Sequence, residues 1–306
     1  MPPLFPKFAN LTMDDRDAYE ALVSSYPPFS DISFTTLHIW WNLDGQLNIS
    51  RLDNNLVIKY SLPFDKDNSG YSLIGTHEVD SSLDVIFKFL HKYKQPKKLV
   101  HVPEFTINKI KHRDHLMISE EMDYHEYILD AKALASLEGR PHSRTRRKVR
   151  RFLREIEGSK LELRELDLEL KSIRDMVYSS IQLWQKKYPI ENDPENTENE
   201  ALKVTLSHTS ILHIRNIAVF IDDKLQGIIF YHKTVDKKHI VLNHLKVNYD
   251  LPHIFDYLTS EVAKEAIKDG VDFINMEMDL GLEGLRKHKM GLRPINFYKK
   301  YTVAVA

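Results

Sequence analysis

The stretch His213–Lys233, "HIRNIAVFIDDKLQGIIFYHK", decides how the second half of this chain folds. Two runs rich in β-branched and aromatic residues flank a polar Asp-Asp-Lys turn, a pattern that predicts an antiparallel hairpin. Residues 239–247, "HIVLNHLKV", follow after a short polar loop and predict a third strand. The second half is therefore expected to begin with a three-stranded antiparallel sheet.

A helix and two further strands are predicted to complete this half. The helix is indicated by four apolar residues at helical spacing and by the glycine that would end it, namely Phe255, Leu258, Val262, Ala266 and Gly270. Residues 271–278, "VDFINMEM", then predict a buried strand. Residues 295–305, "INFYKKYTVAV", predict one last strand.

The first half repeats this order of elements. Residues 47–60 predict two strands around a tight turn, residues 71–75 a third strand, residues 83–90 one face of a helix, and residues 97–102 a short buried strand. The chain is thus predicted to be an α+β protein built from two copies of one unit. Two helices, near residues 142–157 and 171–188, are expected to link the copies, and we place the domains at residues 1–130 and 131–306.

The composition fits two ordinary domains without a membrane span. The 306 residues are 42% hydrophobic and 28% charged, enough for substantial cores and a soluble surface. With 43 basic and 44 acidic residues, any affinity for a nucleic acid must come from a local patch. The absence of cysteine excludes disulfides and cysteine-ligated zinc, and no long apolar run or secretory signal is present, so we expect a cytoplasmic protein.

The segment Ile274–Pro294, "INMEMDLGLEGLRKHKMGLRP", brings two carboxylates close together in the sequence. If the strand continues, Glu277 and Asp279 lie on the same side of it. Paired carboxylates can take a proton from a reacting group or bind a cationic group. The alternative interpretation is structural, with Asp279 paired to a nearby cation to hold the last strand.

The rest of the same segment supplies glycines and cations. Gly281 and Gly284 allow a tight turn with exposed backbone N–H groups. Arg286 and Lys289 share a face if the residues are helical, and they would then hold a phosphate, a carboxylate or the acyl carbonyl oxygen. Asn243, on the third predicted strand of this half, is a further candidate for substrate binding.

A basic stretch between Arg140 and Arg154 is the second candidate site. Eight of its fifteen residues are Lys or Arg and none is acidic. Val149, Phe152, Leu153 and Ile156 predict an apolar helical face, and the opposite face is expected to carry a cationic ridge formed by Arg144, Arg147, Arg151 and Arg154. Such a ridge suits a phosphate backbone, as in tRNA or another polyanion. The alternative is a solvated helix whose arginines pair with the acidic stretches at residues 155–169 or 191–200.

Other site classes find little support in the sequence. The chain has 15 histidines, but their spacing does not predict three or four converging ligands, so we expect no metal site. No phosphate-binding P-loop, dinucleotide fingerprint or serine-hydrolase motif is present.

Three blocks of the sequence resemble the phosphatidylglycerol lysyltransferase C-terminal domain family, also described as DUF2156. They are "FSDISFTTLHIWW" at residues 29–41, "LEGRPHSRTRRKVRRFLRE" at residues 137–155 and "INMEMDLGLEGLRKHKMGLRPINFYKKY" at residues 274–301. The resemblance implies two fused GNAT-like domains, related to enzymes that move an aminoacyl group from tRNA to an amine or hydroxyl acceptor. It does not imply a lipid acceptor, because the lysyltransferases proper carry a membrane region that this chain lacks.

Coenzyme A-dependent GNAT enzymes grip the cofactor pyrophosphate with a glycine-rich loop before the helix that follows the fourth strand. Here the equivalent residues 247–255, "VNYDLPHIF", contain no glycine, and residues 75–83, "GTHEVDSSL", are acidic. No cofactor is therefore predicted, although acetyl-CoA stays open as a donor. The leading hypothesis is an acyl- or aminoacyltransferase acting on a small-molecule or peptide acceptor. The alternative is a non-catalytic protein that binds tRNA or a small metabolite on the same fold.

Overall fold

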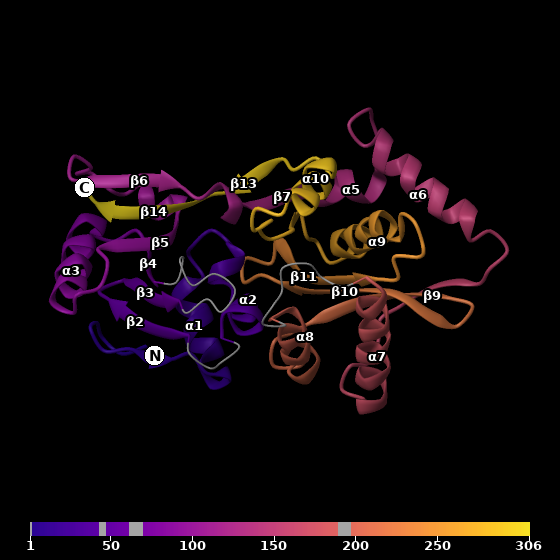
Figure 1. Cartoon of the computed structure of the whole chain (residues 1–306), viewed down its shortest axis with the longest axis horizontal. Coiled ribbons are helices and arrows are strands. Elements are labelled where there is room, and N and C mark those ends of the chain that lie inside the picture. The colour runs from indigo at the N-terminus through magenta and orange to yellow at the C-terminus, as the bar shows by residue number, and fades with distance from the viewer. Residues whose placement is uncertain (1, 43–46, 61–69, 189–196) are drawn as a thin grey trace. The chain divides into compact units, whose positions relative to one another are not determined.

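The computed structural model describes residues 2–42, 47–60, 70–188 and 197–306, which fold into two compact units (Figure 1). Unit 1 comprises Met1–Glu126, Met278–Gly281 and Phe297–Ala306, and unit 2 comprises Tyr127–Glu277 and Leu282–Asn296. The chain thus enters unit 2 near residue 126, returns briefly to unit 1 within the segment 274–294, and ends in unit 1. The domain boundary between residues 130 and 131 stays a prediction.

Unit 1 holds a seven-stranded sheet among its described residues. In spatial order its strands are β1 (Ala9–Asn10), β2 (Asn48–Leu52), β3 (Asn55–Tyr60), β4 (Gly70–Ile74), β5 (Lys98–Pro103), β14 (Lys300–Val305) and β6 (Leu116–Glu120). Strands β2, β3 and β4 form the predicted antiparallel meander, helix α3 (Val79–Lys92) follows, and β5 runs parallel to β4. The register of that parallel pair joins Tyr71 to Leu99.

The core of unit 1 lies between this sheet and α3. The predicted apolar face of α3 is buried, with Ile86 and Leu90 fully inaccessible. Leu99 on β5 and Val303 on β14 complete the same cluster with no exposed surface. Burial of such side chains contributes roughly 1.5–3 kcal/mol each, which fixes α3 on the sheet. The shorter helices of unit 1 are α1 (Arg16–Val23), α2 (Phe34–Thr36) and α4 (Glu104–Ile107).

Unit 2 repeats the arrangement with its own seven-stranded sheet among the described residues. In spatial order its strands are β13 (Asn296–Tyr298), β7 (Glu126–Asp130), β12 (Phe273–Asn275), β11 (His239–Val247), β10 (Lys224–Lys233), β9 (Arg215–Ile221) and β8 (Leu161–Arg164). Strands β9, β10 and β11 form the antiparallel meander, and helix α9 (Ile254–Lys268) crosses to β12, which is parallel to β11. Gly270, with φ +73°, follows α9 as the sequence predicts.

The remaining helices of unit 2 cover its sheet and carry its basic surface. They are α5 (Ala131–Ser136), α6 (Ser143–Glu155), α7 (Lys171–Lys187), α8 (Thr197–Ser207) and α10 (Glu283–Gly291). Helices α6 and α7 confirm the two predicted linking helices. α6 packs on α9 through the rings of Phe152 and Tyr257, whose centroids are 4.9 Å apart.

Two predicted strands differ from the observed ones. The strand expected at residues 271–278 is limited to β12, because Glu277 has φ +56° and its backbone N–H bonds to the Asn275 side-chain oxygen at 2.8 Å. The single last strand expected at residues 295–305 is two strands in two sheets. β13 joins the sheet of unit 2, whereas β14 lies between β5 and β6 in the sheet of unit 1 (Figure 1).

Candidate functional site

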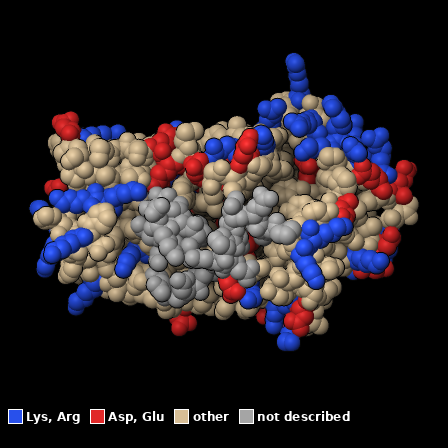
Figure 2. Space-filling model, viewed as in Figure 1, with Lys and Arg blue, Asp and Glu red and all other residues tan. Residues whose placement is uncertain are grey.

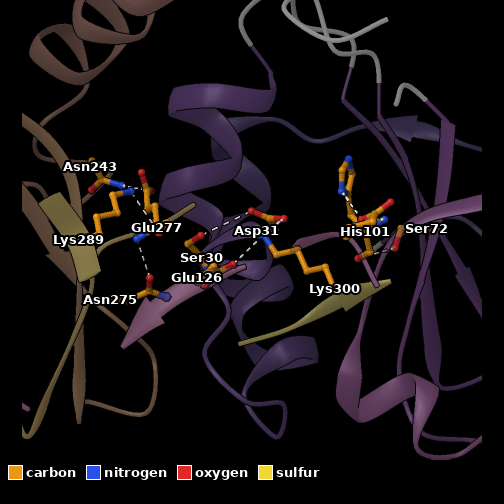
Figure 3. Close-up of polar contacts among 11 residues, drawn as sticks. Ser30, Asp31, Ser72, His101, Glu126, Asn243, Asn275, Glu277, Lys289 and Lys300 are labelled. Carbon is orange, nitrogen blue, oxygen red and sulfur yellow. Dashed lines mark hydrogen bonds and ion pairs between the residues drawn. The ribbon is translucent and has the colours of Figure 1, made fainter. Parts of the chain in front are cut away.

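A polar cluster occupies the place in unit 2 where the parallel strands β11 and β12 part. Their register ends at Val241 and Asn275, and β11 continues beyond it. There the Asn243 side-chain nitrogen donates to Glu277 Oε1 at 3.3 Å (Figure 3). Asn243 Oδ1 lies 2.8 Å from His232 Nδ1. Glu277 as a residue is only partly buried.

Helix α10 brings a lysine to the same cluster. Lys289 is 5% exposed, its Nζ donates to the Glu277 backbone oxygen at 3.2 Å, and it lies 5.7 Å from the centre of the Tyr127 ring (Figure 3). Arg286 lies one turn earlier on α10 and is partly buried. Residues 286 and 289 both lie in α10, so the condition on which they were expected to share a face is met. Glu277, Lys289 and Asn243 thus meet within unit 2.

Asp279 lies in a turn after β12 rather than on the strand. It is fully buried, and its Oδ1 accepts the backbone N–H of Gly281 at 2.8 Å. Gly281 has φ +76°, and a Cβ there would stand 3.0 Å from Asp123 Oδ2, so this turn requires glycine. The expectation that Glu277 and Asp279 project from one strand is wrong, because β12 ends before either. Gly284, expected in a tight turn, lies instead in the first turn of α10.

The basic helix α6 presents an open groove lined largely by arginines. Lys and Arg side chains gather over this helix in Figure 2. The groove is lined by Ser143, Arg146, Arg147, Arg150, Leu153 and Arg154. In the part of the chain that the structure describes, no carboxylate pairs with Arg144, Arg147, Arg150 or Arg154. Uncompensated arginines on one helical face favour a polyanionic ligand.

Two details of α6 correct the predicted ridge. Arg151, expected on the ridge, pairs with Glu155 at 2.8 Å, whereas Arg150 lines the groove in its place. Leu153, expected on the apolar face, is 40% exposed, whereas Phe152 is 1% exposed. Arg150 was not predicted to lie on the ridge, because the inclusion of Leu153 in the apolar face shifted the inferred direction of that face around the helix axis. Buried Thr145, Phe152 and Ile156 alone would have placed residues 147, 150 and 154 opposite the core.

Both helices that follow the meanders carry an acidic group at the N-terminal end. In unit 2, Asp256 in the first turn of α9 is 5% exposed and accepts from Lys148 Nζ at 2.9 and 3.1 Å. In unit 1, Asp80 in the first turn of α3 accepts the backbone N–H groups of Lys111 and His112. A carboxylate of the protein therefore stands at each helix end that would otherwise receive a phosphate.

Comparison with known proteins identifies the family. The model of the family "Phosphatidylglycerol lysyltransferase, C-terminal" matches residues 49–304, most of the chain. The chain belongs to this family. No curated protein matches the sequence. Among the described residues, no group of three or more His, Asp or Glu side chains is placed to hold a metal ion.

Solved structures show that lysyltransferase-family members share this fold. A conserved protein of unknown function from Bacteroides thetaiotaomicron has a TM-score of 0.84 at 19% identity, over 98% of this chain and 99% of that one. L-PGS from Bacillus licheniformis has a TM-score of 0.60 at 14% identity, over 95% of this chain and 92% of that one. A DUF2156 C-terminal domain from Agrobacterium fabrum has a TM-score of 0.63 at 12% identity, over 96% and 92% of the two chains.

The predicted fold class is confirmed. The chain is an α+β protein of two GNAT-like halves, each with a mainly antiparallel sheet flanked by helices. Family and fold together place it among the GNAT-like acyl- and aminoacyltransferases. None of the helices in the described ranges is long and apolar enough to cross a bilayer.

Proposed function

We propose that the chain transfers an aminoacyl group from aminoacyl-tRNA to an amine or hydroxyl acceptor, with the reacting groups in unit 2. The observation that carries this proposal is the groove of α6, where Arg147, Arg150 and Arg154 face solvent without a carboxylate partner among the described residues. A tRNA donor needs such a surface, because its binding energy comes largely from phosphate contacts.

The acidic helix ends support tRNA over coenzyme A as the donor. Asp256 and Asp80 place negative charge where the pyrophosphate of coenzyme A would need backbone N–H groups. We expect calorimetric titration with acetyl-CoA to show no saturable heat. Saturable binding at one site per chain would instead favour a conventional N-acetyltransferase.

Glu277 is the residue best placed to act on the acceptor or on the aminoacyl group. Asn243 orients its carboxylate, which is partly open to solvent. In the proposed step the acceptor nitrogen or oxygen bonds to the ester carbonyl carbon and gives up its proton to Glu277. The carbonyl–oxygen bond to the tRNA ribose then breaks, and the ribose oxygen takes up a proton. General-base assistance of this kind contributes typically 10²- to 10⁴-fold in rate.

The cations of α10 have a separate part in the proposal. Arg286, partly buried, would donate to the carbonyl oxygen as negative charge develops on it. Lys289 is buried and holds the Glu277 backbone oxygen, so it would position the base. Asp279 would act indirectly by fixing the turn at Gly281 that leads into α10.

Transfer from charged tRNA tests the proposal. Total tRNA charged with labelled amino acids is incubated with the protein and a cell extract that supplies acceptors, and label in products other than free amino acid is measured. Glu277→Gln should lower the rate at least about 100-fold. The matched control is Glu283→Gln, whose exposed carboxylate pairs with Lys287 on the outer surface of α10. No transfer by wild type, or equal transfer by the Glu277 variant, contradicts the proposal; salt-sensitive tRNA binding without transfer favours the binding-protein alternative.

A further inference from the structure

The two units repeat a strained residue at the same position of the fold. In unit 2, Glu277 lies two residues beyond Asn275, where the parallel register ends, and has φ +56°. In unit 1, His101 lies two residues beyond Leu99, the registered partner of Tyr71, and has φ +52°. His101 lies inside β5, whereas Glu277 lies just after β12. A left-handed conformation is costly for a residue other than glycine, and such strain gathers at functional sites.

His101 is held as one half of a carboxylate–imidazole pair. Its side chain is fully buried, and its Nδ1 lies 3.0 Å from Glu121 Oε2. The same oxygen accepts the His101 backbone N–H at 3.1 Å, and Thr302 donates to the other carboxylate oxygen. Burial raises the pKa of Glu121, but these hydrogen bonds outweigh it and the net pKa is lowered. Because Glu121 Oε2 lies within hydrogen-bond distance of Nδ1, the His101 tautomer that carries its hydrogen on Nδ1 donates to Glu121 and presents a lone pair at Nε2.

Two buried polar atoms lie at this position without a partner. Within the described residues, neither His101 Nε2 nor the Tyr60 hydroxyl has a hydrogen-bond partner, and the two rings are 5.7 Å apart in a T-shaped arrangement. Tyr60 and His101 are each 2% exposed. Leaving a buried polar atom unpaired costs about 1–3 kcal/mol, so two such atoms on neighbouring rings point to a bound group that the protein alone does not provide.

The charges and rings around His101 select the kind of group. Three carboxylates stand close to Tyr60, because Asp31, Glu126 and Glu121 each raise the pKa of its hydroxyl, after burial as the main cause. The buried cation beside them is Lys300, which pairs with Asp31 and Glu126. This leaves an excess of negative charge. The ring centroids of Trp41 and Tyr124 lie 5.6 and 4.3 Å from that of His101. Carboxylates, aromatic faces and an imidazole lone pair together suit an ammonium group.

We propose that unit 1 binds a small molecule through a primary ammonium group. This group donates a hydrogen bond to His101 Nε2 and lies against the Tyr60 ring and the Glu121 carboxylate. This site is separate from the transfer chemistry assigned to Glu277 and does not depend on it. A primary ammonium has N–H groups to donate, which a quaternary ammonium lacks. It also carries a charge that an alcohol of the same size lacks.

Calorimetric titration of the whole chain tests this site. The probes are ethylamine, ethanolamine and 1,4-diaminobutane, with ethylene glycol as the neutral control and tetramethylammonium as the quaternary control. At least one amine should bind saturably at one site per chain, and both controls should bind at least 10-fold more weakly. His101→Asn, which tolerates the left-handed backbone, should weaken amine binding at least 10-fold, and Tyr60→Phe should weaken it several-fold. Glu283→Gln, an exposed carboxylate on α10 outside both sites, should bind the amine as wild type does.

Three results overturn the proposal. One is the absence of saturable binding by every amine tested, which leaves buried water as the partner of His101 and Tyr60. Another is equal binding of ethylene glycol. The third is unchanged amine binding in both Tyr60→Phe and His101→Asn. Because this experiment measures binding, none of these outcomes tests the transfer reaction, which has its own assay.

Discussion

Lys300 carries its charge in the interior of unit 1. Its Nζ lies 2.9 Å from Glu126 Oε1 and also pairs with Asp31, while Glu126 accepts the Ser30 backbone N–H at 2.7 Å (Figure 3). Burial lowers the pKa of Lys300, but the two carboxylates outweigh it and the net pKa is raised. Burial raises the pKa of Asp31, and the Lys300 ammonium only partly offsets this. The Lys300 ammonium is the buried counter-charge of these two carboxylates.

Lys300→Met should therefore destabilise the protein strongly. Removing the cation leaves two buried carboxylates without their counter-charge, which costs about 3–5 kcal/mol at neutral pH. Urea unfolding followed by circular dichroism measures the loss. The neighbouring Lys299→Met is the matched control, because that side chain is 38% exposed in its pair with Glu120 and should change stability by less than about 1 kcal/mol. Equal effects of the two substitutions would contradict the assignment.

Sequence patterns could not have placed Lys300 inside. It belongs to "FYKKY", where alternation alone suggests that one of two adjacent lysines faces solvent, and nothing local says which. The partners Asp31 and Glu126 are distant in the chain, so their meeting depends on the final arrangement of strands. By contrast, Phe152 and Ile86 were predictable as buried residues, because helical spacing reports a buried face from neighbouring residues alone.

His288 makes stability depend on pH. Burial lowers its pKa to about 4, helped by Lys148 and Lys289 and opposed by Asp256. The ring lies against Phe255, with centroids 4.1 Å apart. Because the folded pKa lies below the unfolded value of about 6.5, the unfolded chain binds more protons between those values, and stability falls as pH drops from about 6.5 to about 4.

The prediction for His288→Gln is a flatter profile over that range. The loss attributable to His288 is up to about 3 kcal/mol at the acid end. Urea unfolding at a series of pH values measures the free energy of unfolding. Subtracting the variant from wild type removes the contribution of the other histidines. Curves that stay parallel from pH 7 to pH 4 would show that His288 does not titrate as described.

At the scale of single elements, α6 is a helix whose surface could be predicted in part from the sequence. Its position and basic character were predictable, because eight of the fifteen residues from Arg140 to Arg154 are cationic and none of them is acidic. The identity of the groove-lining arginines was not, because it depends on how the helix is rotated against Tyr257 and Asp256 of α9. Sequence spacing fixes relative angles on a helix but leaves the contact face to packing.

Charge removal on α6 should weaken tRNA binding through the groove. The triple variant Arg147→Gln, Arg150→Gln, Arg154→Gln is expected to reduce the slope of log affinity against log salt by about 2–3. Filter binding to bulk tRNA over a salt series measures this. Arg151→Gln is the control on the same helix, because Arg151 already pairs with Glu155 and lies outside the groove. A triple variant with the wild-type slope would exclude the groove as the contact surface.

At the scale of the whole molecule, the sheets do not follow the order of the sequence. The final strand β14 pairs with β5 and β6 in unit 1, although the residues just before it, β13, belong to the sheet of unit 2. The duplicated meander, helix and parallel strand were predictable because each is a run of neighbouring residues. The placement of β14 was not, because "KYTVAV" satisfies the edge of any sheet with a matching apolar face.

This topology makes unit 1 dependent on the last residues of the chain. Stopping translation after Tyr298 removes β14, so β5 keeps β4 but loses its antiparallel partner, β6 loses the strand it pairs with, and the core loses Val303 and Lys300. The amides of β5 should then lose their protection from hydrogen exchange, whereas those of β10 in unit 2 should keep theirs. A stop after Val305 is the control and should leave both patterns unchanged. Protected β5 amides in the shorter chain would contradict this prediction and mean that unit 1 folds without β14. The reason is that β14 supplies the pairing on one edge of β5, and hydrogen exchange of the β5 amides reports that pairing.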